Sequence, residues 1–587
     1  MNAALPAALS ILAYIFGYRF YSKFLSEKIF HLDEKARTPA HTLNDGIDYV
    51  PTNKMVLFGH HYASIAGLAP MLGPAVAVIW GWFPVLMWLV LGALFVGCVH
   101  DFGSMVVSLR SRGMSIGKVT EGIIGERAKT LFHLVIFFMV SLAMGVFVYV
   151  IAFLFSPAPS PDQADIHFPQ AVISSFGLML IAIAIGWMGY KKKISWNILT
   201  PIGFVLLLLL VFVSKDEQVL NTTGLGNPQT APTVFEWSVI LLTYAFFASV
   251  LPVWSLLQPR DFLNSLLLYL GLGSLYLGFF ILRPEFVAPA VRLHPEGAPG
   301  LFPFLFIIVA CGAASGFHSL VASGTTAKQL NKETDARFIG YGGMVGESLL
   351  ALAAVLATTA GIINADVWQQ NYASWASVQG LGAQVGIFVQ GCSTFLESLG
   401  IDRYTGSSFI SLIVVSYALT SLDSATRLLR YNIEEMSQTF GIPFLGNRFI
   451  ASILAIAAIC CFAFYTIDGR PAGLVLWQLF GTTNQILAGL ALLAVTLYLL
   501  QRGKPWYYTG IPMVFMLIVT LRAMITNLLQ FLNKGEWPLF FIGLFMIVLA
   551  VWLIFEAIIA VRKFYQKKVI ISSMAVFPPD SQNSSEE

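Results

Sequence analysis

The chain has 587 residues, of which 57% are hydrophobic and 11% charged, and its mean hydropathy is +0.75. Ordinary globular domains carry about 25% charged residues, so the composition excludes a water-soluble protein of this length. The net charge of only +3, with no separate Lys/Arg-rich arm, argues against a nucleic-acid partner. Apolar stretches long enough to cross a hydrocarbon layer of about 30 Å recur along the whole chain, so a lipid bilayer is the expected environment.

The first expected membrane span covers about residues 3–24. It has some features of a signal peptide, but its first cation is Arg19 and no small-residue cleavage site follows. We therefore keep it as a membrane helix, followed by a polar stretch from Lys28 to Lys54.

Apolar runs bounded by charged and turn residues predict an all-α polytopic membrane protein with about fifteen spans. The other fourteen are expected at about 62–80, 83–109, 129–155, 169–189, 195–213, 235–257, 263–282, 301–323, 340–363, 405–422, 449–466, 472–500, 507–532 and 538–561. Segment 384–400 is apolar but short and broken by Gly, which predicts an interfacial or re-entrant piece.

Lys and Arg are distributed unevenly over alternate loops. Placing the N-terminus outside assigns 27 of the 34 to the cytoplasmic side, as the positive-inside rule requires. The C-terminus is then cytoplasmic, with a tail at 563–587 whose last residues are predicted to be disordered. The polar stretches are too short to form an independent soluble domain.

Proline and glycine interrupt two of the expected spans. The positions concerned, in spans 62–80 and 235–257, are Gly67, Pro70, Gly73, Pro252, Trp254 and Gln258. Backbone groups freed at membrane depth are tolerated only where they face a ligand or a water-lined cavity. A half-helix that begins there directs its amides and its positive dipole at the cavity, which favours a carboxylate substrate. For either span alone, a proline kink used only for packing is the alternative.

The two interruptions fall in helices one and six of a core counted from the second span, so the two halves have opposite topology. Paired interrupted spans in matching halves indicate a binding site near the membrane midplane. We therefore expect a five-plus-five inverted-repeat transport core at 61–431. One transmembrane helix and a cytoplasmic loop at 1–60 precede this core, and about four C-terminal helices at 432–562 follow it.

Several motifs stand in order between about residues 30 and 500. They are Asp45-Gly-Ile-Asp-Tyr-Val-Pro-Thr-Asn-Lys54, Leu57-Phe-Gly-His-His-Tyr-Ala-Ser-Ile-Ala-Gly67, His100-Asp-Phe102, Gln258-Pro-Arg-Asp-Phe-Leu-Asn264, Ala310-Cys-Gly-Ala-Ala-Ser-Gly-Phe-His-Ser319, Ser323-Gly-Thr-Thr326, Ser416-Tyr-Ala-Leu-Thr-Ser-Leu-Asp-Ser-Ala-Thr-Arg427 and Leu476-Trp-Gln-Leu-Phe-Gly-Thr-Thr-Asn-Gln485. Together they resemble the carbon starvation protein A family.

This resemblance implies a permease of the bacterial cytoplasmic membrane that is induced when carbon is scarce. Members are associated with the uptake of pyruvate and of peptides. The family is grouped with transporters of the five-plus-five inverted-repeat (LeuT/APC-like) fold, in agreement with the paired interruptions. The loops here are compact, so a function housed in the longer loops of other members is in doubt for this chain.

Ionisable residues within the spans are costly to bury and are therefore candidates for proton coupling. They are His100, Asp101, His318 and Glu347. A histidine beside a carboxylate can titrate near neutral pH, as a coupling proton requires. Packing alone is the alternative for the His100–Asp101 pair and for Glu347. Ser315 and His318 lie among small residues and are also expected to contact the substrate.

Gating residues are expected at the cytoplasmic ends of the spans. They are His61, which with His60 precedes the first interrupted helix, and Arg260, Asp261, Asp423 and Arg427. Asp423 and Arg427 are four residues apart, and such a pair often only stabilises its own helix.

No spacing in the sequence indicates a structural metal or a bound cofactor. The five cysteines, Cys98, Cys311, Cys392, Cys460 and Cys461, are interpreted as small apolar packing residues without a metal role. Hydroxyls at Ser323, Thr325 and Thr326 could bind sodium. A proton is the preferred coupling ion because titratable residues are available.

The leading hypothesis is secondary active import of a small carboxylate, with pyruvate first and a peptide as the alternative. The chain has no P-loop pattern, which argues against ATP-driven pumping. A membrane nutrient sensor is the alternative from another class, although no sizeable cytoplasmic domain supports it. An intramembrane enzyme is only weakly indicated, and a channel least of all. The sequence leaves the oligomeric state open.

Overall fold

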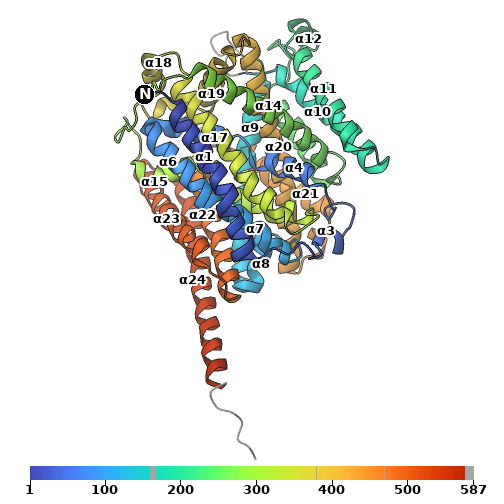
Figure 1. Cartoon of the computed structure of the whole chain (residues 1–587), viewed down its shortest axis with the longest axis vertical. Coiled ribbons are helices and arrows are strands. Elements are labelled where there is room, and N and C mark those ends of the chain that lie inside the picture. Colours follow the sequence, from blue (N-terminus) through green and yellow to red (C-terminus); the bar gives the residue numbers. More distant parts are fainter. Residues whose placement is uncertain (159–166, 379, 468–469, 575–587) are drawn as a thin grey trace, which may run out of the picture.

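The computed structural model describes residues 1–158, 167–378, 380–467 and 470–574, which form a bundle of long helices (Figure 1). One end of the bundle, called here the N-terminal end, carries the N-terminus and the short helices α12 (Glu217–Thr222) and α18 (Ala365–Asn371). The opposite end, called the tail end, carries α3 (Pro39–Thr42) and α8 (Ile116–Ile123). The last helix, α24 (Trp537–Met574), projects beyond the bundle there.

Within the described residues, eleven helices are long and apolar enough to cross a membrane, or twelve if one bent pair counts as a single span. The structure therefore confirms a mostly helical, multi-pass membrane protein. Of the fifteen predicted spans, 62–80 corresponds to the bent pair, and three others, 235–257, 301–323 and 449–466, fall outside the twelve because their helices are short or interrupted. The spans 235–257 and 449–466 form α13 (Val234–Val250) and α21 (Arg448–Phe464), each of 17 residues.

The first span is continuous from Ala4 to Phe30, through α1 (Ala4–Phe16), η1 (Gly17–Tyr21), α2 (Ser22–Phe24) and η2 (Leu25–Phe30). The other long helices are α6 (Trp82–Gly92), α7 (Cys98–Arg110), α9 (Glu126–Phe155), α10 (Gln170–Gly186), α11 (Trp196–Ser214), α14 (Leu257–Leu282), α17 (Gly342–Ala360), α19 (Leu381–Glu397), α20 (Arg403–Phe440), α22 (Ala472–Gln501) and α23 (Tyr507–Lys534). A two-residue hairpin pairs β1 (Thr466–Ile467) with β2 (Arg470–Pro471). The predicted interfacial segment 384–400 lies mostly in α19.

The first predicted interruption is present, but its span begins earlier than expected. α4 (Lys54–Ile65) and α5 (Ala69–Ala77) form a pair bent by 46°. Three residues, 66–68, separate the two helices. His60 and His61 therefore lie inside the first half of the bent span, whereas the sequence analysis placed them before it. The His, Gly and Tyr residues lower the hydrophobicity of α4, so the sequence does not identify it as part of a membrane span.

The second predicted interruption is in the wrong place. α13 ends at Val250 and α14 begins at Leu257, so Pro252 and Trp254 lie in the connection between two separate helices. The structure instead interrupts the predicted span 301–323, which divides into α15 (Leu301–Ile308) and α16 (Gly316–Gly324). The intervening residues 309–315 are not helical.

Burial separates central helices from peripheral ones. In the most hydrophobic 18-residue stretch of α22, 94% of the residues are buried, whereas only 22–28% are buried in the corresponding stretches of the first span, α11 and α24. Large apolar side chains such as Leu209, Phe212 and Phe555 are exposed on these outer helices. Soluble proteins rarely expose so much contiguous apolar surface, and here it is the surface that faces lipid.

Glycine allows the interrupted span to approach α22. A Cβ on Gly316 would lie 2.1 Å from the Asn484 carbonyl oxygen and 2.6 Å from the Ala488 nitrogen. Within the same interruption, Gly312 has a φ of +90°, a conformation that L side chains rarely adopt. The geometry of this segment is therefore set by two positions that tolerate no side chain.

We predict that Gly316→Ala destabilises the protein by about 1–3 kcal/mol, the usual cost of adding atoms to a packed interior. The matched control is Gly273→Ala in α14, where an added Cβ meets nothing within 4 Å. It should be neutral or stabilising by up to about 1 kcal/mol. Thermal unfolding of the two purified variants in detergent measures the difference. Equal melting temperatures for both would contradict the close α16–α22 contact.

Candidate functional site

A chain of ionisable side chains crosses the buried centre of the bundle from α7 to α17. The Nδ1 atom of His100 lies 2.7 Å from Asp101 Oδ1, and Asp101 Oδ2 lies 2.9 Å from Nδ1 of His318 on α16. The other ring nitrogen, Nε2, lies 3.2 Å from Glu347 Oε2. All four side chains are fully buried. The structure thus brings together the four residues predicted for proton coupling.

Local backbone irregularities precede α7, which carries His100 and Asp101, and α17, which carries Glu347. The π-helical turn η4 (Ala93–Gly97) stands directly before α7, and η8 (Arg337–Tyr341) stands directly before α17. Such turns insert an extra residue into a helix and are frequent at functional sites. His318 lies in the first turn of α16, immediately after the interruption.

Several polar atoms of this cluster have no hydrogen-bond partner in the described structure. They are Nε2 of His318, both carboxylate oxygens of Glu347, Nε2 of His100 and Nε2 of His61. The ion pairs recorded for Asp101 and Glu347 are all with imidazoles. Leaving a buried polar group unpaired costs free energy. The contact between His318 Nε2 and Glu347 therefore favours a positive charge between them, either a proton or a metal ion.

A cavity of about 1720 Å³ leads from the surface toward this cluster, and its lining includes none of the four side chains themselves. At its mouth are exposed residues between α23 and α24, including Lys534 and Trp537. Its walls come from α5, α9, α15 and α22, and its lining includes Gly73 of the first interrupted span and Cys311 of the second. The cavity therefore opens toward the N-terminal end and reaches the place where the two interrupted spans meet.

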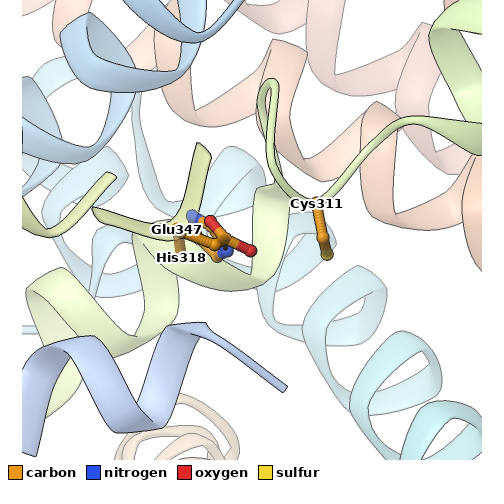
Figure 2. A group of neighbouring side chains, drawn as sticks. All are labelled: Cys311, His318 and Glu347. Carbon is orange, nitrogen blue, oxygen red and sulfur yellow. Dashed lines mark ion pairs between the residues drawn. The ribbon is translucent and has the colours of Figure 1, made fainter. Parts of the chain in front are cut away.

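Cys311 connects the cavity to the buried cluster. Its Sγ atom and ligand atoms of His318 and Glu347 all lie within 4.8 Å of one another. Figure 2 shows the sulfur on the non-helical segment, with the His318 ring beside the Glu347 carboxylate. This donor set could hold a metal ion. Cys311 was expected to be a packing residue, and nothing in the sequence indicates its position on the cavity wall.

A second ionic cluster lies between α4, α13, α14 and α20. Arg260 forms a two-pronged ion pair with Asp423, in which Nη2 lies 3.1 Å from Oδ1. Its Nη2 also lies 2.6 Å from Asp261 Oδ1, and Asp261 Oδ2 lies 2.7 Å from Nδ1 of His60. Tyr244 donates a hydrogen bond to Asp423 Oδ2 at 2.5 Å. Arg260, Asp261 and Asp423, three of the predicted gating residues, therefore form one buried network.

The anticipated Asp423–Arg427 pair does not form. Asp423 pairs with Arg260, and Arg427 instead donates to Asp48 Oδ1 at 2.8 Å. Arg430 contacts the same carboxylate at 3.1 Å. Burial alone raises the pKa of Asp48, but the charges of Arg430 and Arg427 outweigh it and hold the pKa well below its ordinary value. Neither Asp48 nor Arg430 was predicted as a site residue.

The segment 45–53, called here the strap, packs across the tail end of the bundle. Nε1 of Trp254 donates to the Gly46 carbonyl at 3.0 Å, and the Val253 nitrogen donates to the Ile47 carbonyl at 3.0 Å. Nε2 of Gln258 donates to Thr52 Oγ1 at 2.8 Å.

The lining of the cavity does not include Pro252, Trp254 or Gln258. Their predicted contact with substrate stays a prediction, and in the structure Trp254 and Gln258 hold the strap.

The other predicted substrate residues lie near the interruptions. Gly67 is in the connection between α4 and α5, where an added Cβ would lie 2.4 Å from Ser421 Oγ. Pro70 is buried in the first turn of α5, and Gly73 lines the cavity. Ser315 accepts a hydrogen bond from Asn484 Nδ2 at 3.0 Å. Of these positions, Gly73 alone is among the residues that line the cavity.

The three hydroxyls considered for sodium are each engaged by different protein groups. Ser323 Oγ accepts the Ile116 N–H at 3.0 Å. Thr325 Oγ1 accepts from Gln329 Nε2 at 2.9 Å, and Thr326 Oγ1 lies 2.9 Å from Nδ1 of His61. His61, predicted to act in gating, is therefore fixed to the segment that follows α16.

The chain also resembles known protein families and structures. The family described as Carbon starvation protein CstA matches residues 2–380 and 363–523. Peptide transporter CstA of Campylobacter jejuni is 32% identical over 90% of this chain and 81% of the relative. Pyruvate/proton symporter BtsT of Escherichia coli K12 is 30% identical over 88% of this chain and 80% of the relative.

Among solved structures, an Eremococcus coleocola manganese transporter matches with a TM-score of 0.46 at 12% identity, covering 89% of this chain and 99% of that one. MhsT in complex with L-phenylalanine matches with a TM-score of 0.42 at 13% identity, covering 81% and 99%. From the family match and the similarity to these relatives over most of its length, the chain belongs to the carbon starvation protein CstA family.

Proposed function

We propose that the protein is a secondary active transporter of the bacterial cytoplasmic membrane that imports a small carboxylate, with pyruvate as the first candidate, by proton coupling. One observation carries this proposal: the cavity of about 1720 Å³ is lined by Gly73 and Cys311 of the two interrupted spans, and the Cys311 sulfur lies within 4.8 Å of ligand atoms of His318 and Glu347 in the buried histidine–carboxylate chain. Midplane sites at paired interrupted helices are typical of secondary transporters. The names of the two relatives, a peptide transporter and a pyruvate/proton symporter, agree with this class.

Peptide uptake is the second candidate, and the size of the cavity favours it. Pockets for small ligands commonly measure about 300–1,000 Å³, and this cavity is larger. Its lining is largely apolar, with polar side chains such as Gln384, Asn527 and Gln530. Pyruvate and a peptide both carry a carboxylate, so either substrate can use the same amide-rich helix N-terminus.

The positions of the interruptions lead us to propose a revised repeat. The first unit comprises α4–α5, α6–α7, α9, α13 and α14, and the second comprises α15–α16, α17, α20, α21 and α22. Helices α10 and α11 are then an inserted hairpin. The contacts agree with an internal pseudo-symmetry: α4 packs on α14 as α15 packs on α22, and α5 packs on α17 as α16 packs on α7. With α1, α23 and α24 the total remains fifteen spans.

Proton coupling is supported by the charge inventory of the buried chain. Two carboxylates, Asp101 and Glu347, flank the imidazole of His318. A proton between His318 Nε2 and Glu347 satisfies both groups. When this proton is lost, two carboxylates face a neutral imidazole, and their negative charge is uncompensated in a low-dielectric site. We prefer a proton to sodium because the three candidate hydroxyls are already engaged by protein groups.

The tail end is the closed side of the transport path. The Arg260–Asp423 network and the strap, held by Asp48, lie between the cluster and that end. Following the positive-inside distribution, we place the tail end in the cytoplasm and the N-terminus outside. The structure then represents an outward-open state, and opening inward requires these ion pairs to separate.

We predict that Glu347→Gln uncouples transport. Glutamine resembles the protonated carboxyl, so exchange of labelled substrate across proteoliposomes should persist, whereas accumulation driven by an inward proton gradient should fall by about 5- to 150-fold. Pyruvate and a dipeptide are tested as labelled substrates. His133→Gln is the matched control, because that buried imidazole pairs separately with Asn432.

If wild-type protein, shown to be folded, takes up neither substrate under a proton or a sodium gradient, the transporter proposal fails and a sensing role becomes the better account. Proton-driven accumulation that is unchanged in Glu347→Gln would contradict the coupling role alone.

We also predict that Asp48→Asn loosens the strap. Removing one partner of a largely buried ion pair leaves Arg427 and Arg430 uncompensated and costs about 3 kcal/mol or more. Hydrogen exchange of the amides of Ile47, Tyr49 and Thr52 should therefore accelerate. Glu34→Gln is the control, because the Glu34–Lys332 pair is exposed and solvent screens its charges.

The pH dependence of the strap has a definite sign. The pKa of Asp48 is lower in the folded protein than in the unfolded chain, where it is about 3.9. The ion pairs of Asp48 therefore stabilise the fold fully at every pH above that value. This stabilisation is lost only as the pH falls below it. Strap protection, corrected for intrinsic exchange, should be constant from about pH 5 to pH 8. A loss of protection within that range would contradict the lowered pKa.

A further inference from the structure

Three potential metal ligands meet at the floor of the cavity. The Sγ atom of Cys311 and ligand atoms of His318 and Glu347 lie within 4.8 Å of one another, and all three residues are buried (Figure 2). In the part of the chain that the structure describes, this is the one such group of three or more His, Cys, Asp and Glu residues. We propose that these residues form a binding site for a thiophilic divalent cation of the Zn²⁺ class.

Unsatisfied atoms give independent support for a ligand here. Nε2 of His318 and Oε2 of Glu347 face only each other, 3.2 Å apart, and Oε1 of Glu347 is buried without a hydrogen-bond partner in the described structure. Buried polar groups almost always find partners, and exceptions call for an explanation such as an ion. A proton shared between Nε2 and Oε2 leaves Oε1 of Glu347 and the Cys311 sulfur outside the contact, whereas a metal ion can bind all three side chains.

The donor set identifies the class of ion. Thiolate, imidazole and carboxylate are the protein ligands of zinc, and three of them leave a fourth position open for water or a substrate oxygen. A thiolate disfavours Mg²⁺ and Ca²⁺, which take oxygen ligands. With bonds of about 2.0–2.3 Å, the donors of a tetrahedral site lie about 3.3–3.8 Å apart. Closing the widest separation therefore needs a shift of about 1 Å.

The surroundings allow the donor atoms to move closer together and hold the His318 ring in the orientation that binding requires. Cys311 lies in the segment 309–315, next to Gly312 and outside the regular helices, where the Ala313 and Ala314 amides bond back to the Ala310 carbonyl in a turn. Nδ1 of His318 is held by Asp101 at 2.9 Å, which directs Nε2 toward Glu347. A carboxylate that orients a histidine in this way is the usual outer layer of a zinc site. His100 in turn fixes Asp101 at 2.7 Å.

Access to the site comes from the cavity, since Cys311 lines it. Binding of the ion requires the thiolate, so the thiol proton leaves through the same cavity to water. A metal ion and a proton between His318 and Glu347 are therefore alternative occupants. The proposal goes beyond transport, because metal binding is measured on purified protein without any substrate.

The experiment titrates Co²⁺ into purified full-length protein in which the more accessible thiols are removed by Cys460→Ser and Cys461→Ser. We expect a thiolate-to-cobalt charge-transfer band at one ion per chain that added Zn²⁺ displaces. Cys311→Ser should abolish this band. Glu347→Gln should weaken cobalt binding by more than the roughly 10–100-fold that loss of an outer-layer partner costs. Cys392→Ser, at another buried cysteine, should change neither the charge-transfer band nor the cobalt affinity.

The same titration can overturn the proposal. It fails if the folded background protein shows no thiolate band, or if the band survives Cys311→Ser. If Cys311→Ser unfolds, cobalt binding is instead compared between Glu347→Gln and the background protein, because glutamine has the same size as glutamate. Equal cobalt affinity in folded Glu347→Gln and in the background protein excludes Glu347 as a ligand and rejects the three-residue site.

Discussion

The central constraint on this molecule is the burial of opposite charges where two interrupted helices meet. Isolated charges are very costly in a membrane, and they persist only when they pair or are hydrogen-bonded. His318 meets this constraint by lying between Asp101 and Glu347, which come from two different helices. The non-helical segment 309–315 and the close approach at Gly316 place α16 where its imidazole can reach both.

The two ends of the bundle differ in how they are filled. Toward the N-terminal end, a largely apolar cavity leads inward as far as Cys311. Toward the tail end, arginines occupy the corresponding space: Arg260 pairs with Asp423, and Arg427 pairs with Asp48 of the strap. Charge-assisted pairs of this kind are geometrically specific and can exchange partners. This asymmetry supports the outward-open state proposed above, in which the path is open on the cavity side and closed at the tail end.

Much of the fold could be predicted from the sequence because the thickness of a bilayer fixes the length of an apolar span. Asp101, His318 and Glu347 could be selected for the same reason, since an ionisable residue within such a span is rarely accidental. The second interruption could not be located correctly. Pro252 and Pro259 attracted attention, yet proline is equally natural in a connection or in the first turn of a helix, which is where they lie.

The true interruption contains no proline. Its signal was a run of small residues around Gly312, which is weaker because glycine also serves helix packing in membranes. Contacts between distant positions were not available to sequence reasoning. Arg427 pairs with a residue 379 positions away in preference to its near neighbour Asp423, because the strap folds back over α20. The role of Cys311 likewise depends on the cavity, a property of the assembled bundle.

Access to Cys311 tests the account most directly. In membrane vesicles of known orientation that carry Cys460→Ser and Cys461→Ser, a small charged methanethiosulfonate reagent should modify Cys311 from the outer face. A transported carboxylate should slow that modification, because it occupies the same cavity. Modification only from the cytoplasmic face, or none in vesicles that are competent for transport, would contradict an outward-open cavity that ends at the buried cluster.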